Sequence, residues 1–280
     1  MSTPEGRLIV ALAQEQKLRV LAVVADQPVN DIVQRHNLVG RAAQLCAEGV
    51  VASLLMSAHI KGEERLMVQV QGEKPRFSFM ADVRPDGRVR ARFRPTALPP
   101  GTELTGALLA AKWLGQKEIY RGAATVEQDW QGSMERYLSD SQQSLGMVRL
   151  GAKLDENGRV VFASGLLIES VGGSGLEREE FEALVGPLRS ADLGEVMTIF
   201  AFGQLQGAPV EVLEARPVLV NCGSTTPRIE AMLRSLGAAE LQSILEEQGQ
   251  AEVTCDWCND QVVIGADRLR ELIAEIGAAS

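Results

Sequence analysis

The sequence predicts an α+β protein in which an antiparallel-sheet body with a central helix is followed by a helical linker and a small C-terminal domain. Three observations support this prediction. Apolar and polar residues alternate between turn signals over residues 64–94, a helical segment rich in small residues precedes them, and three of the four cysteines lie in the last sixty residues. We therefore place the domains at residues 1–175, 176–220 and 221–280.

The first sixty residues predict a strand pair and a long helix. Residues 7–24 contain two apolar, β-branched runs around a polar break, which is typical of two strands joined by a turn. Residues 31–60 have a helical pattern, and their many small side chains suit a closely packed central helix. We expect Cys46 to be a small buried side chain of this helix, and His36 and His59 to lie on helix surfaces or at caps.

Residues 64–94 predict an antiparallel meander with turns at residues 71–72 and 85–87. In its last strand four arginines occur at every second position and therefore share one face: Arg88, Arg90, Arg92 and Arg94. Three interpretations of this face remain open. It is a solvated sheet face, a surface that docks acidic segments of this chain or of a partner, or, more weakly, a phosphate-binding surface.

The rest of the body continues the mixed pattern. Residues 104–117 predict a short strand or helix, and residues 131–144 predict a helix. Residues 146–171 predict two strands joined at the turn signal 155–158. The glycine-rich stretch 172–175 is the clearest boundary in the chain.

Beyond this boundary we expect two short amphipathic helices over residues 177–185 and 193–200, which are marginal alone and need a surface to lie on. A connecting strand follows over 204–221. The last domain is predicted to contain helices over 227–236, 239–247 and 268–276, the last capped by Asp267, and a hairpin that carries Cys255 and Cys258.

Composition and charge narrow the classes of function. The chain has 280 residues and a net charge of -9, and residues 221–280 alone carry 4 basic and 10 acidic side chains. An acidic tail argues against nucleic acid as the main partner, because phosphate binding needs a net basic surface. No apolar run is long enough to span a bilayer and no signal-peptide pattern is present, so we expect a cytoplasmic protein with no membrane partner.

Three cysteines predict the chemistry of the C-terminal domain. Cys255 and Cys258 form a C-x-x-C, a spacing that lets two thiolates bind one metal ion or close a small disulfide loop. Cys222 lies about thirty residues upstream, far enough for the chain to fold back between them. In a reducing cytosol metal binding or redox sensing is the expected use, so we predict a zinc-type domain. A complete zinc site needs a fourth ligand, and the position that would complete a C-x-C is Ser224.

Several motifs carry a likeness to a known family. They are HIKGEERLMVQVQG and ADVRPDGRVR in the body, YLSDSQQS, FASGLLIESV, and the tail from PVLVNCGS to VTCDWCN. With these motifs the chain resembles the 33 kDa chaperonin family, the redox-regulated heat-shock holdases. Cys222, Cys255 and Cys258 match three of the four cysteine positions of that family. Ser224 occupies the fourth, and Gln142 stands where the family usually has Glu.

The resemblance implies an ATP-independent chaperone that holds unfolding client proteins under heat and oxidative stress, as a homodimer when active. Residues 1–175 would bind clients, and four thiolates would hold zinc in the reduced tail. Oxidation would release the zinc, form disulfides within the C-x-C and the C-x-x-C, and unfold the tail and the linker. Cys222, Cys255 and Cys258 would then be both zinc ligands and the redox switch, with Ser224 as a weak fourth ligand.

Ser224 changes this scheme, because serine is a poor zinc ligand and cannot form a disulfide. Three outcomes stay open. The first is a weakened three-thiolate zinc site completed by water, Ser224, Asp256 or Asp260. The second is a zinc-free tail folded by packing, and the third is a half-switch in which Cys255 and Cys258 alone oxidise. Activation by heat more than by oxidant is then a reasonable hypothesis.

Two rival functions come from other classes. In a thiol-disulfide oxidoreductase Cys255 would attack and Cys258 would resolve, but no thioredoxin-like βαβ pattern surrounds the motif. A zinc-ribbon adaptor that binds nucleic acid is suggested by the arginine strand and opposed by the acidic tail. The sequence contains no nucleophile elbow and no phosphate-binding loop, so we predict a protein that is not an enzyme.

Overall fold

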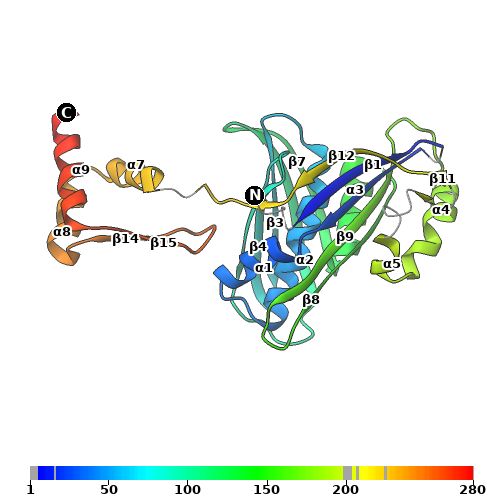
Figure 1. Cartoon of the computed structure of the whole chain (residues 1–280), viewed down its shortest axis with the longest axis horizontal. Helices are drawn as coiled ribbons and strands as arrows, with labels where there is room; N and C mark the ends of the chain where they lie inside the picture. Colours follow the sequence, from blue (N-terminus) through cyan, green and yellow to red (C-terminus); the bar gives the residue numbers. More distant parts are fainter. Residues whose placement is uncertain (1–5, 16, 198–203, 206–207, 224–225, 280) are drawn as a thin grey trace. The chain divides into compact units, whose positions relative to one another are not determined.

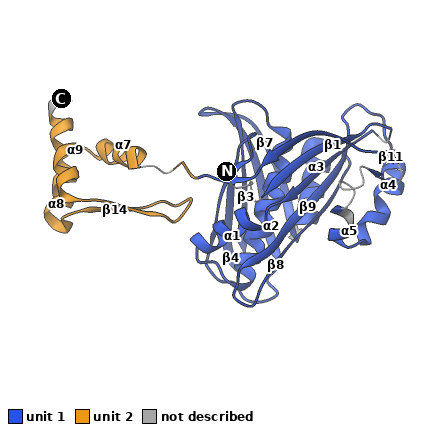
Figure 2. Cartoon of the chain, in the orientation of Figure 1, with its two compact units in different colours: residues 1–221 blue, residues 222–280 orange. Residues whose placement is uncertain are grey.

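A computed structural model describes residues 6–15, 17–197, 204–205, 208–223 and 226–279. The chain forms two compact units, residues 1–221 and residues 222–280 (Figure 2). The first unit contains two sheets with helices between and beside them, and the second is a small helical unit with one hairpin (Figure 1). The predicted α+β class is confirmed.

The first sheet of the larger unit has five antiparallel strands in the order β12-β1-β2-β9-β8. Its strands are β1 (Arg7–Ala13), β2 (Leu18–Val24), β8 (Gly146–Leu154), β9 (Val160–Ser170) and β12 (Glu211–Pro217). The two predicted strand pairs, 7–24 and 146–171, therefore lie side by side in one sheet. The predicted connecting strand at 204–221 contributes β12, which extends this sheet by pairing with β1.

The second sheet has six strands in the order β13-β5-β4-β3-β6-β7, antiparallel except for the parallel pair of β13 with β5. Its strands are β3 (Glu64–Glu73), β4 (Arg76–Val83), β5 (Arg88–Arg94), β6 (Leu104–Leu114), β7 (Lys117–Gln128) and β13 (Leu219–Val220). The predicted meander is β3-β4-β5. The segment left open as strand or helix is the strand β6, and its partner β7 was not predicted.

The predicted central helix is α2 (Gly40–Met56), which contacts strands of both sheets. Thirteen of its 17 residues are buried, including Cys46, and the polar Arg41, Gln44 and Glu48 share one partly buried face, so most of the helix surface is apolar, as a helix between two sheets requires. Gly49 lets the helix approach its neighbours closely, because a Cβ there would lie 2.5 Å from the Trp130 ring and 2.8 Å from the Phe79 ring.

The helical pattern over residues 31–60 is confirmed, but it does not form one continuous helix. The segment forms two helices, α1 (Asp26–Arg35) and α2, followed by a short 3-10 turn, η1 (Ser57–His59). Asn37 has a φ of 52° in the break between them, a backbone conformation that ends a helix and that asparagine tolerates. His36 caps the C-terminus of α1, which agrees with its predicted role.

The outer face of the five-stranded sheet is covered by the linker. The helices α4 (Arg178–Ser190) and α5 (Leu193–Met197) pack beside β8 and β9 (Figure 1). The predicted second helix, 193–200, extends beyond α5 into positions outside the described residues. Two short strands, β10 (Gln204–Leu205) and β11 (Ala208–Pro209), follow before β12. The remaining body helix, α3 (Trp130–Gln142), matches its prediction.

The smaller unit has its own apolar core. It consists of α7 (Thr226–Leu236), α8 (Ala238–Gln248), β14 (Ala251–Thr254), β15 (Gln261–Ile264) and α9 (Ala266–Ala279). Its buried residues are Ile229, Leu233, Leu241, Ala251, Ile264, Leu269 and Leu272. Asp267 lies inside the first turn of α9 and not at its cap, which corrects that detail. Among the described helices of the whole chain, none is long and apolar enough to cross a membrane.

Glu48 predicts a pH dependence of stability. Burial in α2 raises the pKa of Glu48 from 4.5 to about 7, although the Arg41 charge and a hydrogen bond from Gln44 act the other way. The unfolded chain gives up this proton near pH 4.5 and the folded chain near pH 7. The folded state is therefore progressively destabilised as pH rises between these values, by about 3 kcal/mol at most.

Replacement Glu48→Gln should remove this penalty. We expect the variant to be more stable than the parent at pH 8 and close to it at pH 5, measured by urea unfolding at both values. The exposed Glu103→Gln is the matched control, with no differential effect expected. An equal stability difference at pH 5 and pH 8 would contradict the account.

Candidate metal and redox site

The C-x-x-C lies in the turn of the C-terminal hairpin. Cys255 follows β14 directly, and Cys258 lies three residues later, before β15. Two backbone hydrogen bonds close the turn: the Cys255 N–H donates to the Asp260 carbonyl at 2.9 Å, and the Asn259 N–H donates to the Cys255 carbonyl at 2.8 Å. Asn259 has a φ of 58°, which allows the sharp reversal. The hairpin therefore fixes the backbone that presents both thiols.

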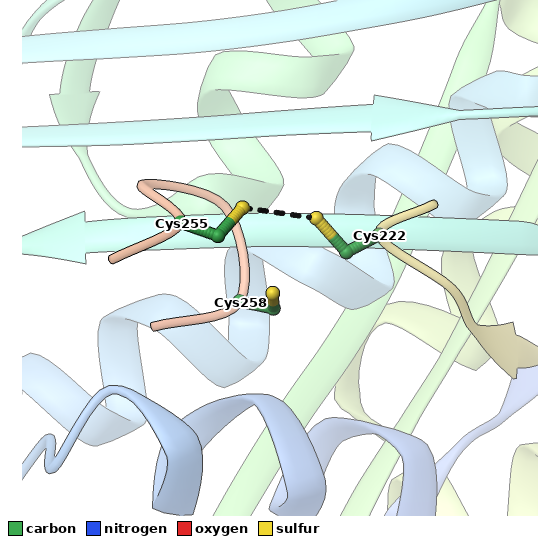
Figure 3. Close-up of side chains that lie close together, drawn as sticks. All are labelled: Cys222, Cys255 and Cys258. Carbon is green, nitrogen blue, oxygen red and sulfur yellow. Dashed lines mark hydrogen bonds between the residues drawn. The ribbon is translucent and has the colours of Figure 1, made fainter. Parts of the chain in front are cut away.

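The structure brings Cys222 to the same place. It lies after β13 and before α7, and its Sγ is 3.3 Å from Sγ of Cys255 (Figure 3). The Sγ atoms of all three cysteines lie within 4.8 Å of one another. Cys222 and Cys255 are partly exposed, whereas Cys258 is 4 % exposed. The structure therefore brings together the three cysteines that the sequence predicted to form one site.

This cluster fits a zinc ion. A tetrahedral site with Zn–S distances of about 2.3 Å separates its sulfurs by about 3.8 Å, which is compatible with the observed cluster. The Trp257 N–H points to Sγ of Cys255 at 3.4 Å, the kind of outer hydrogen bond that orients a metal-bound thiolate. The three thiolates would hold the ion and leave one position for a further ligand. Ser224, one candidate for that position, lies outside the described residues.

The arginine face on β5 is partly neutralised by a neighbouring strand. Asp82 of β4 is 3 % exposed and accepts from Arg90 Nη2 at 2.9 Å and from Arg65 Nη1 at 3.0 Å. Arg88 pairs with Asp86 in the adjoining turn at 2.7 Å. Val89, Ala91 and Phe93 are buried on the opposite face, as the alternation predicted. Part of the positive charge is therefore used within the sheet.

Sequence reasoning missed the polar contacts that hold the linker to the body. Arg149 of β8 donates to the carbonyls of Leu188, Arg189 and Ala191 at the C-terminus of α4, with 2.7 Å to Leu188 and 2.8 Å to Ala191. Arg189 in turn bridges Glu135 of α3 at 2.8 Å and Glu182 of α4 at 3.1 Å. No sequence signal pairs Arg149 with α4, because they are about forty residues apart and meet only through the fold.

Another missed cluster lies at the end of α2. Glu169 of β9 is 2 % exposed and accepts from Arg19 Nε at 2.6 Å, while Nε2 of His59 lies 3.2 Å from its carboxylate. Burial alone would raise the pKa of Glu169, but the His59 hydrogen bond and the charges of His59 and Arg19 outweigh it and hold that pKa below its ordinary value. His59, the last residue of η1, therefore also contributes to a partly buried ion cluster, which the predicted helix-surface or capping role did not include.

The fold and the site together define a class of protein. Its members have a body of two sheets, a linker that covers one of these sheets, and a small C-terminal unit with clustered cysteines. A family model described as Hsp33 protein matches residues 6–264. The chain belongs to the Hsp33 family.

Relatives of similar length agree with this assignment. The 33 kDa chaperonin of Citrifermentans bemidjiense is 31 % identical over 96 % of this chain and 97 % of its own length. The 33 kDa chaperonin of Bacillus subtilis is 27 % identical over 95 % and 97 %. The crystal structure of the 33 kDa chaperonin from Thermotoga maritima superposes with a TM-score of 0.83 at 19 % identity, covering 99 % of this chain and 100 % of that one, and so shares the fold.

The cysteine cluster predicts metal binding that is measurable with cobalt. We expect the reduced protein to bind one Co²⁺ per chain with thiolate charge-transfer absorption, and Zn²⁺ to displace it. Replacement Cys255→Ser should weaken binding by on the order of 100-fold or more, because loss of a direct ligand costs at least as much as loss of an outer-shell partner. The buried Cys46→Ser is the control, and an unchanged spectrum in Cys255→Ser would contradict the site.

Proposed function

We propose that this chain is an ATP-independent holdase that binds unfolding proteins and protects them from aggregation under heat and oxidative stress. Family membership supports a chaperone. The observation that carries the finer proposal is the apolar outer face of the five-stranded sheet, which the linker covers. In this proposal residues 1–175 are the client-binding core, residues 176–220 the linker and residues 221–280 the switch.

The covered face has the composition of a client-binding surface. Strands β1, β2, β8 and β9 contribute buried apolar side chains to it: Ala11, Ala13, Leu18, Val20, Ala22, Met147, Leu166 and Ile168. The linker contributes Phe181, which is 1 % exposed, and Val185, which is fully buried. Unfolding proteins expose apolar segments, so a sheet face of this kind binds them once its cover leaves.

The cover is suited to reversible release. The described part of α5 has five residues, and α4 packs through one apolar stripe, so neither helix is stable without the sheet. The contacts from Arg149 and Arg189 hold α4 by polar groups that water can replace, and partly exposed ion pairs of this kind contribute about 1 kcal/mol or less. The linker therefore belongs to the part of a fold that opens first on heating.

The cysteine cluster supports a redox contribution to this release. Cys222, Cys255 and Cys258 would bind zinc in the reduced state, and metal binding would stabilise the small unit that follows the linker. Ser224 cannot form the disulfide that a C-x-C would form, so the switch is weaker than one built on four cysteines. Heat then takes a larger share in activation, and the active form is a homodimer in the cytoplasm.

The rival functions have less support. Cys255 and Cys258 lie on the antiparallel hairpin β14-β15, and among the described residues no parallel βαβ unit surrounds them as in a thioredoxin-like oxidoreductase. For a nucleic-acid adaptor the arginine face would need to be available, and Asp82 and Asp86 already neutralise part of it. A client-binding protein without catalytic activity remains the function that the geometry supports best.

Replacement Phe181→Ala tests whether the linker masks the binding surface. Truncating a fully buried Phe costs about 3–5 kcal/mol, more than the docking of a marginal helix is expected to supply. We expect the reduced variant to suppress aggregation of a heat-unfolded model client several-fold better than the parent, without ATP, as measured by light scattering.

The exposed Glu179→Gln on the same helix is the matched control and should behave like the parent. Increased protease cleavage within residues 178–190 should accompany the gain in the Phe181→Ala variant. A variant in which α4 is released but client aggregation is unchanged would exclude this face as the client-binding surface.

A further inference from the structure

We propose that oxidation joins Cys222 to Cys255, and not Cys255 to its sequence neighbour Cys258. This inference deepens the proposed redox regulation and rests on it. Three clustered thiols can form one disulfide and leave one thiol over, so the pairing must be decided by geometry and access. The family pattern gives no guide, because the partner that a C-x-C would offer to Cys222 is absent.

Sulfur geometry permits the long-range pair. Sγ of Cys222 and Sγ of Cys255 are 3.3 Å apart (Figure 3), so an approach of roughly 1 Å brings them to the disulfide distance of about 2.05 Å. The backbone of Cys255 is held by the two turn hydrogen bonds, whereas Cys222 lies within the described residues 221–223, which are neither helix nor strand. Cys222 can therefore supply the small movement.

Access favours the same pair. An oxidant must reach a sulfur before a disulfide forms, and reactivity follows exposure of the thiol. Cys222 and Cys255 are partly exposed, whereas Cys258 is 4 % exposed and is shielded within the hairpin turn. The two sulfurs that lie 3.3 Å apart are thus also the two that are partly exposed.

The chemistry balances with a hydroperoxide as the oxidant. The thiolate of one cysteine attacks the O–O bond of hydrogen peroxide, which gives a sulfenic acid and releases hydroxide. The thiolate of the second cysteine then attacks that sulfur, forms the S–S bond and expels a second hydroxide. Two thiols lose two electrons and two protons in total, and one peroxide is reduced to two waters. Cys258 remains a thiol.

The pairing decides how much of the small unit stays restrained after oxidation. A Cys222–Cys255 bond spans a sequence separation of 33 residues and encloses α7, α8 and β14. A disulfide that closes a long loop restrains the unfolded chain far more than one that closes a C-x-x-C loop. The small unit also has an apolar core of its own and a Glu230–Arg268 ion pair at 2.7 Å. The redox contribution to release of the linker then comes from loss of the bound metal and not from the disulfide, and heat supplies the rest.

Disulfide mapping of the full-length chain tests the pairing. The reduced, metal-free protein is treated with hydrogen peroxide, its remaining thiols are alkylated under denaturing conditions, and it is digested without reduction. Trypsin places Cys222 in residues 190–228 and both other cysteines in residues 235–268. Cleavage before aspartate then separates Cys255, in residues 235–255, from Cys258, in residues 256–259. We expect residues 192–228 linked to residues 235–255, in a chain that migrates as a monomer without reductant.

Variants and a built-in control sharpen this test. Replacement Cys258→Ser should leave the linked peptide unchanged, and Cys222→Ser should abolish it. Cys46 should remain a thiol throughout, because its side chain is fully buried in the core around α2 and burial raises its pKa to about 12. A loop between Cys255 and Cys258, a Cys222–Cys258 bond, a bond between two chains or no disulfide would each overturn the inference.

Client protection is measured on the same oxidised sample. Loss of the holdase function would show as unsuppressed client aggregation whatever the peptide map contains. If the Cys222–Cys255 peptide is found but client aggregation is not suppressed, the pairing stands and the proposed function is rejected. If client aggregation is suppressed but the disulfide joins Cys255 to Cys258, the proposed function stands and the pairing is rejected.

Discussion

The body of this protein depends on one constraint, which is that its five-stranded sheet is apolar on both faces. One face is buried against α2 and the second sheet, and a water-exposed second face would leave side chains such as Leu18, Leu166 and Ile168 in solvent. Burial of apolar area is the main favourable term in folding, so this face must be covered by something. In the resting chain the cover is the linker, and an unfolding client would offer a chemically equivalent one.

The proposed competition gives a reason for the weak attachment of the linker. Its apolar contacts centre on Phe181 and Val185, and Arg149 adds polar contacts to the end of α4. A more tightly bound linker would keep clients off the apolar sheet face at all times. A more weakly bound linker would leave this face exposed to solvent, and the protein itself would then tend to aggregate. The strand β12 then pairs with β1 and leads directly into the segment that carries Cys222, so covalent continuity connects the cover to the thiol-bearing unit.

The sequence predicted those features that depend on local pattern. Alternation identified the meander and placed Val89 and Phe93 inward, small residues identified α2, and cysteine spacing identified the site before any geometry was seen. Features that depend on contacts distant in sequence were not predicted. These include the pairing of β12 with β1, the acceptance of two arginines by Asp82, and the contacts of Arg149 with the end of α4. The break at Asn37 was missed because one left-handed residue interrupts an otherwise helical pattern.

The central claim is that client binding and release of the linker are one event. The most direct test is hydrogen–deuterium exchange of residues 178–190, read out by mass spectrometry. It is carried out over a temperature series with reduced and with oxidised protein, and suppression of client aggregation is measured on the same samples. The account predicts that loss of amide protection in α4 and gain of client protection share one midpoint in each series, because both report exposure of the same sheet face. Full client protection while α4 stays protected from exchange would contradict it.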